Sequence, residues 1–209
     1  DIIVCRTENE ISDSIREKLA LFCNVRKECV IQNMTADNLY AIPLLLEKEG
    51  LAVEACKKLE LSNIKPKNQE WEQMVENIRS IGDNTVNIAI VGKYVQLEDS
   101  YISVMESIRH AGFANKVHTK ITLINSEEIT KENVAKKLEG VQGIVVPGGF
   151  GTRGVEGKIE TIKYARENNI PFLGICLGMQ MAVVEFARNV LNLKDADSIE
   201  FNPNTQNPV

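Results

Sequence analysis

The sequence lacks a positive charge balance and long hydrophobic runs. Its 209 residues carry a formal net charge of −5 at pH 7, so no overall basic field favours nucleic acid or an anionic membrane. No apolar run approaches the ~20 residues that cross a bilayer. We therefore expect a cytoplasmic protein that has neither a nucleic acid nor a membrane as partner.

The first ten residues, DIIVCRTENE, lack both an initiator methionine and the basic first region of a signal peptide. They open inside a predicted strand. We therefore expect that the natural chain begins further upstream.

Histidine is scarce, and paired-cysteine motifs are missing. The five cysteines form no C-x-x-C pair, so the sequence predicts reduced thiols rather than a disulfide framework or a zinc site. Four of them are interpreted as inert core residues: Cys5, Cys23, Cys29 and Cys56. The two histidines, His110 and His118, are both expected to face solvent, which leaves few candidates for an imidazole base.

The pattern that is present alternates strands with helices. Short apolar runs predict strands at residues 2–5, 29–32, 86–91, 117–124, 143–146 and 170–175. Apolar residues at helical spacing predict helices at residues 11–19, 51–59, 71–78, 100–110, 130–139, 156–168 and 177–191. This alternation favours an α/β fold in which helices cover both faces of a parallel sheet.

A polar stretch divides the chain into two α/β parts. SNIKPKNQ, residues 62–69, contains a proline and no apolar periodicity, which is typical of a linker. An amphipathic helix with Trp71 follows it and ends before Gly82. We therefore predict one domain over residues 1–60, a linker with one helix over 61–83, and a second domain over 84–209.

The stretch GICLGMQ places Cys176 between two glycines, after an apolar strand and before a helix. This is the pattern of a nucleophile elbow, in which small neighbours allow a sharp turn beneath an exposed nucleophile. The start of a helix also favours the thiolate over the thiol, and the thiolate is the attacking species. The other interpretation is a small residue buried in the core.

Acyl transfer also needs donors for the developing oxyanion. The N–H of Leu177 is one candidate, and the second is expected from VPGGFG, residues 146–151, which leaves a neighbouring strand at the same edge of the sheet. Gly148 and Gly149 allow that loop to approach a ligand closely. Gln180 follows Cys176 by one helical turn, so its amide can face the same pocket.

Two Gly-Lys pairs, in IVGKY and GVEGKI, resemble part of a phosphate-binding loop. Neither has the required earlier glycine, and neither is followed by Ser or Thr. We interpret Lys93 and Lys158, the lysines of these pairs, as residues of ordinary strand-to-helix turns.

Long stretches of the chain resemble a known family, the CTP synthases. NIAIVGKYVQLEDSYISVMESIRHAG and GIVVPGGFGTRGVEGKIETIKYARENNIPFLGICLGMQ are similar to its glutaminase domain, which is class I glutamine amidotransferase-like with a flavodoxin-like three-layer fold. CRTENEI, KLALFCNV and NLYAIPLLL resemble its amidoligase domain, which is of the P-loop-type α/β class. The resemblance covers essentially the whole chain.

The resemblance implies an enzyme of pyrimidine nucleotide biosynthesis, a ligase that makes CTP from UTP, ATP and L-glutamine. With ATP and Mg²⁺, O4 of UTP is phosphorylated in the amidoligase domain. The glutaminase domain releases ammonia from glutamine, and the ammonia displaces that phosphate. GTP is the family's allosteric activator and CTP its inhibitor, and members form homotetramers and filaments.

The resemblance also assigns residues of the glutaminase part. Cys176 is the nucleophile, and Leu177 and Gly149 supply the oxyanion hole. Glutamine is bound by residues of the elbow, the glycine loop and one later acidic position: Gly149, Leu177, Gly178, Met179, Gln180 and Glu200. Phe150 and Arg153 belong to the loop associated with GTP.

In the amidoligase part, the resemblance assigns Lys18 to UTP or CTP and Arg6 to ATP. The segment that contacts adenine corresponds to Met34, Thr35 and Ala36, where the bacterial pattern is Lys-Asp-Val. Because backbone atoms often hold adenine, the assignment of Ala36 is retained.

Family members extend beyond this sequence at both ends. Their phosphate-binding loop and magnesium carboxylates precede it, and their catalytic His and Glu follow Val209. We therefore expect no bound metal here, and we expect this stretch alone to make no CTP and to hydrolyse no glutamine. Two alternatives stay open: a catalytically dead amidotransferase-like scaffold that acts in assembly, and another amidotransferase with a cysteine elbow.

Overall fold

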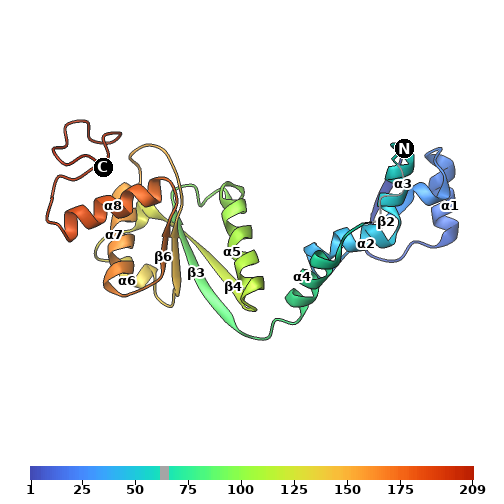
Figure 1. The fold of residues 1–209 in the computed structure, drawn as a ribbon, viewed down its shortest axis with the longest axis horizontal. Helices are drawn as coiled ribbons and strands as arrows, with labels where there is room; N and C mark the ends of the chain where they lie inside the picture. Colours follow the sequence, from blue (N-terminus) through green and yellow to red (C-terminus); the bar gives the residue numbers. More distant parts are fainter. Residues whose placement is uncertain (62–65) are drawn as a thin grey trace. The chain divides into compact units, whose positions relative to one another are not determined.

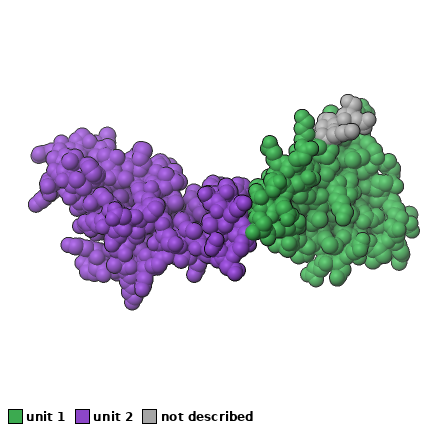
Figure 2. Space-filling model, turned by 60° about the horizontal axis from the view of Figure 1, so that its bottom comes forward, with its two compact units in different colours: residues 1–80 green, residues 81–209 purple. Residues whose placement is uncertain are grey.

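The structure of the chain, a computed structural model, describes residues 1–61 and 66–209, apart from the side chain of Glu98. It forms two compact units, residues 1–80 and 81–209 (Figure 2). The first four residues of the predicted linker, 62–65, lie outside the described residues. Within the described ranges, every helix is too short or too polar to cross a membrane.

The first unit is built on two parallel strands, β1 (Ile3–Thr7) and β2 (Val30–Met34), whose carboxyl ends meet where Thr7 pairs with Met34. Helix α1 (Asp13–Phe22) connects them through the 3₁₀ turn Lys27–Cys29 (Figure 1). A second 3₁₀ turn and three helices follow: Leu39–Ala41, α2 (Ile42–Lys48), α3 (Leu51–Lys58) and α4 (Gln69–Arg79). Between α2 and α3, Gly50 has a φ of 87°, a conformation that glycine adopts without strain.

Helix α4 packs against the first unit. The Trp71 indole N–H donates to the Tyr40 carbonyl over 2.7 Å, and the two rings lie 6.4 Å apart between centroids. Val75, on the same helix, is buried. The helix that the sequence assigns to the linker thus packs against residues that precede it in the first unit.

The second unit contains a parallel sheet with the strand order β4-β3-β5-β6. The strands are β3 (Thr85–Gly92), β4 (His118–Asn125), β5 (Gly143–Val146) and β6 (Phe172–Gly174). Successive residues of β3 face opposite sides, as the period of two requires. Ala89 and Val91 belong to one buried cluster, whereas Ile90 belongs to the other.

Helices cover both faces of this sheet, as the alternation in the sequence predicts. Figure 1 shows α5 (Ile102–Ala114) on one side and α6 (Val134–Lys137), α7 (Val155–Glu167) and α8 (Leu177–Asn189) on the other. Short 3₁₀ turns, Glu98–Tyr101 and Ser126–Glu128, follow β3 and β4. The larger cluster lies between the sheet and α7 and α8, where Ile159, Met181 and Val184 are buried.

Two expectations are wrong. The helix predicted over 130–139 is reduced to the four residues of α6, because the Asn133 side chain accepts from the Thr130 N–H and donates to the Glu128 carbonyl, which stabilises a turn. Cys23 is exposed rather than part of the core, because it lies at the end of α1. Cys29 is buried, Cys5 and Cys56 are half-buried, and all five thiols are free.

Candidate active site

Cys176 lies on a sharp turn between β6 and α8. Its backbone has φ 54° and ψ −111°, a strained conformation for a residue with a side chain, and it is the N-cap residue of α8. A Cβ on Gly174 would lie 2.6 Å from the Gly178 carbonyl carbon, and one on Gly178 would overlap the Val146 carbonyl. The two glycines therefore permit the turn. Cys176 is exposed, so it is not a buried core residue.

Hydrogen bonds fix this turn to the sheet. The Ile175 N–H donates to the Val146 carbonyl over 2.9 Å, and the Gly178 N–H donates to the Ile175 carbonyl over 2.9 Å. The Leu177 side chain is buried in the larger core cluster and anchors the first turn of α8. As the first residue of that helix, Leu177 has a backbone N–H without an intrahelical acceptor, which leaves it suited to an oxyanion.

The glycine loop after β5 reaches the cysteine. β5 and β6 are parallel neighbours, so the chain segments that follow them leave the same edge of the sheet. A Cβ on Gly148 would lie 3.4 Å from the Cys176 Cβ and 3.7 Å from its Sγ, which is ordinary van der Waals contact. The proximity that the sequence predicts between VPGGFG and Cys176 is therefore present.

The next residue of the loop faces two lysines. A Cβ on Gly149 would lie 3.1 Å from the Lys93 Cε and 3.5 Å from the Lys158 Nζ. Lys158 donates to the Pro147 carbonyl over 3.4 Å, and Lys93 donates to the Gly151 carbonyl over 3.1 Å. Both lysine side chains therefore support the backbone of the glycine loop.

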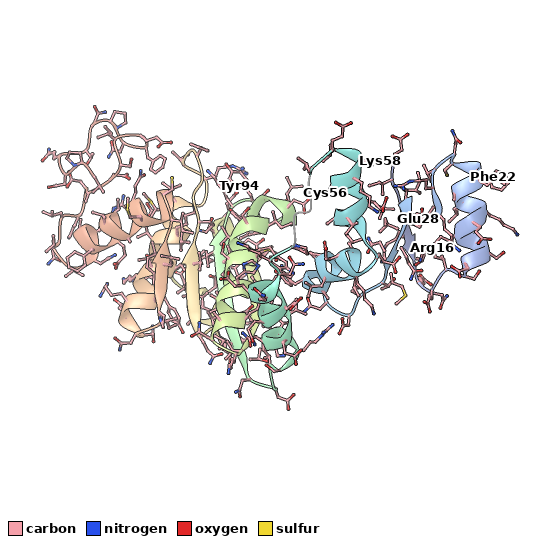
Figure 3. The ribbon with its side chains drawn as sticks, turned by 45° about the vertical axis from the view of Figure 1, so that its right-hand side comes forward. Arg16, Phe22, Glu28, Cys56, Lys58 and Tyr94 are labelled. Carbon is pink, nitrogen blue, oxygen red and sulfur yellow. The ribbon has the colours of Figure 1, made fainter. Side chains whose placement is uncertain are left out.

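Both lysines are shielded from solvent. Lys158 is 0% and Lys93 6% exposed. Tyr94, which follows β3 and is labelled in Figure 3, lies beside Lys93, whose Nζ is 5.5 Å from its ring centroid. Burial lowers the pKa of Lys158 from 10.5 to about 8, the neighbouring Lys93 lowers it as well, and Cys176 raises it.

Sequence patterns alone assign neither lysine to the site. Each belongs to a Gly-Lys pair that lacks the remaining residues of a phosphate-binding loop, so no motif gives it a function. One signal was available for Lys158. It lies between Val155, Ile159 and Ile162 on the buried face of α7, at a position where the helical spacing predicts an apolar residue. A lysine on such a face indicates either a buried partner or a functional charge.

Replacing Lys158 by methionine is expected to stabilise the fold near pH 7, because an unpaired buried cation costs free energy. A pKa lowered from 10.5 to about 8 corresponds to about 3 kcal/mol. Below about pH 8 both states bind the proton and the full cost is present. Between about pH 8 and 10.5 only the unfolded state binds it, so wild-type stability rises with pH in this window.

Urea unfolding of the wild type and of Lys158→Met at about pH 7 and about pH 10 measures this difference. The variant should have the higher free energy of unfolding at the lower pH, and the gap should shrink at the higher pH. Lys163→Met, a half-buried lysine on the same helix, is the control and should show no such convergence. A Lys158 variant that is less stable than the wild type near pH 7 would contradict the assignment of an unpaired charge.

The other residues expected at glutamine differ in how the structure places them. Gln180 is half-buried one turn after the cysteine, and its N–H donates to the Cys176 carbonyl over 3.1 Å. Met179 is exposed beside it. Glu200 is exposed in the segment after α8, where its N–H donates to the Ser198 hydroxyl, and none of the described contacts links it to Cys176.

The residues expected at GTP lie on the outer part of the glycine loop. Phe150 is 79% exposed, which is unusual for an aromatic side chain and leaves its ring free to stack. Arg153 forms an ion pair with Glu127 over 3.1 Å. The roles of both residues stay predictions.

Neither histidine lies at the thiol. His118 begins β4, at the opposite end of the parallel sheet from Cys176, and it is exposed. His110 is exposed near the end of α5, where its ring lies 6.0 Å from that of Phe113. Since the chain has two histidines, the described residues provide no imidazole base beside the sulfur.

In the first unit, the structure brings together two of the positions expected at ATP. The Arg6 guanidinium donates to the Thr35 hydroxyl over 2.6 Å, because β1 and β2 end side by side. Ala36 follows directly and is half-buried. Lys18 is exposed on α1, and no described contact joins it to this group. Within the described ranges, no cluster of three or more His, Cys, Asp or Glu residues could hold a metal ion.

Comparisons with known proteins match both units. The family model "Glutamine amidotransferase class-I" matches residues 96–207, and "CTP synthase N-terminus" matches residues 1–61. Curated proteins named CTP synthase from Clostridium acetobutylicum and Bacillus subtilis are 58% and 53% identical over 209 residues. These matches cover 100% of this chain and 39% of each relative, so the chain spans well under half of their length.

A solved structure is also similar. It is titled Trypanosoma brucei CTPS, glutaminase domain with bound acivicin, and it shares 46% identity with a TM-score of 0.56. The match covers 59% of this chain and 48% of that chain. The three-layer arrangement of the second unit is therefore that of a glutaminase domain.

Proposed function

Because the chain belongs to the class I glutamine amidotransferases and joins to this domain a CTP synthase N-terminal segment, we propose that it is part of a glutamine-dependent CTP synthase. Such an enzyme aminates UTP to CTP with ATP and with ammonia from L-glutamine. The observation that carries the proposal is the exposed thiol of Cys176 on a strained turn, beside the glycine loop.

The thiolate of Cys176 attacks the carboxamide carbon of glutamine and forms a C–S bond. The electron pair of the carbonyl moves to oxygen, where the N–H groups of Leu177 and Gly149 stabilise the negative charge. When the tetrahedral adduct collapses, the C–N bond breaks and the nitrogen leaves as ammonia after taking up a proton. Water then hydrolyses the thioester, which releases glutamate and regenerates the thiol.

The substrate is held by residues around the elbow. Gln180 lies one helical turn after Cys176 and on the same face of α8, so its amide can bind the polar head group of glutamine. Gly178 and Met179 line the first turn of the same helix. Glu200 is proposed to bind the α-ammonium group, which requires its exposed segment to approach the elbow.

In this proposal, residues 1–60 are part of the amidoligase domain, residues 61–83 are the linker and residues 84–209 are the glutaminase domain. The first of these parts contributes to the synthetase reaction. Arg6, Thr35 and Ala36, which meet where β1 and β2 end, would contact ATP. Lys18 would contact UTP or CTP. Mg²⁺ bound with ATP would supply charge neutralisation at its phosphates, GTP would activate through Phe150 and Arg153, and the enzyme would assemble as a homotetramer.

Acivicin labelling of the full-length protein tests the glutaminase assignment. We expect one molecule on Cys176, identified by peptide mass spectrometry, and we expect L-glutamine to protect it. Cys23 is the internal control, because it is also exposed but lies in the first unit. Labelling of Cys23 and Cys176 at equal rates, or no protection by glutamine, would contradict a glutamine site at the elbow.

A further inference from the structure

Lys93 and Lys158, which lie beneath the glycine loop, are buried cations of the second unit. Among the described residues, no ion pair joins a carboxylate to Lys93 or Lys158. Three carboxylates on α7, on α8 and on the turn after β4 have other partners, as the pairs Glu156–Arg188, Glu185–Arg166 and Glu127–Arg153 show. Buried cations without a counter-ion are rare in proteins unless a negative charge is present at some stage of function.

Cys176 lies on the other side of the glycine loop, and its thiol can become negative. Gly148 faces Cys176 and Gly149 faces the two lysines, so one layer of backbone separates the sulfur from the ammonium groups. The glycines keep this layer thin, because a side chain at either position would fill the space between them. The loop also holds the lysines in place through the Pro147 and Gly151 carbonyls.

We propose that Lys158, assisted by Lys93, is a positioning residue that stabilises the thiolate of Cys176 through the glycine loop. The lysines touch neither the sulfur nor the substrate, and they act by charge across the backbone. Only the use of this thiolate in catalysis rests on the proposed function. The effect of the lysines on the thiol can be measured without glutamine.

The electrostatics agree with this arrangement. An opposite charge favours the ionised form of a cysteine, and it does so more strongly away from water. Cys176 raises the pKa of Lys158, so the two side chains lie close enough to interact. Because that pKa is about 8, the cation is present at neutral pH and is lost as the pH rises.

Alkylation with iodoacetamide tests the proposal. The rate at Cys176 and at Cys23 would be followed by peptide mass spectrometry from about pH 6 to about pH 10, in the wild type and in Lys158→Met. We expect the rate at Cys176 to fall about tenfold near pH 7 in the variant, with Cys23 unchanged. The difference should shrink above about pH 9, where Lys158 is neutral in the wild type as well.

Two further variants complete the experiment. Lys158→Arg keeps the charge and should retain most of the wild-type rate, and Lys93→Met should slow Cys176 in the same direction. If Lys158→Met does not fold, Lys93→Met carries the test by the same criteria. Three results overturn the proposal: an unchanged rate at Cys176 near pH 7, an equal loss at Cys23, or a deficit that is the same at every pH. The last result would indicate a purely structural effect.

Discussion

Replacing Cys176 by alanine is expected to abolish glutamine-dependent CTP formation by the full-length protein. The loss should be at least about a thousandfold, because removing a nucleophile leaves only the binding and oxyanion groups to act. CTP formation from UTP, ATP and added ammonium chloride should stay within about twofold of the wild type. The reason is that Cys176 lies in the second unit, remote in sequence from residues 1–60.

The two nitrogen sources should be assayed side by side at about pH 8, with the rate of UTP conversion as the measure. Cys23→Ala is the matched control, since it removes another exposed thiol and should leave both activities intact. If Cys176→Ala lost both activities, the division of labour between a glutaminase and a synthetase part would be wrong. If it kept both, Cys176 would not be the nucleophile.

Replacing Gly178 by alanine is expected to disrupt the elbow. The added methyl group would overlap the Val146 carbonyl, which belongs to the central β5 and cannot move without breaking the sheet. Overpacking against backbone costs several kcal/mol, at or above the upper end of the usual range of about 1–3 kcal/mol for extra methylenes in a core. Glutamine use should be lost together with stability.

Thermal unfolding followed by circular dichroism, with acivicin labelling of Cys176, measures both effects. Gly82→Ala is the control, because a Cβ there meets no atom within 4 Å, and it should be neutral or slightly stabilising. Wild-type stability and wild-type labelling in Gly178→Ala would mean that α8 does not pack on β5 as described.

The behaviour expected of Lys158 separates function from stability. The wild type keeps a charge in its interior that lowers the stability of the fold near neutral pH, and the same charge favours the reactive form of Cys176. A methionine there should give a more stable protein with a slower thiol. Strained or desolvated groups retained at the expense of stability are typical of catalytic sites.

The strands and most helices of the second unit are predictable from the sequence, because each depends on local periodicity. A short apolar run precedes Cys176, and the segments on either side of that run have the apolar spacing of helices. The structure places β6 in the run and α8 in the segment that follows it. The helix expected over 130–139 is the exception. Its apolar spacing is sufficient for a helix, but hydrogen bonds of the Asn133 side chain stabilise a turn, and such competition is invisible to periodicity.

By itself, the sequence determined the elbow, because the need for glycine on both sides of Cys176 arises within five consecutive residues. Only the tertiary structure decided that Lys93 and Lys158 lie beneath the glycine loop and that Arg6 meets Thr35. Lys93 and the glycine loop follow the paired strands β3 and β5, and Arg6 and Thr35 lie where β1 and β2 end, so parallel pairing brings these distant segments together. Lys158 reaches the loop from α7. The burial of a charge depends on every element packed around it, so no local pattern can specify it.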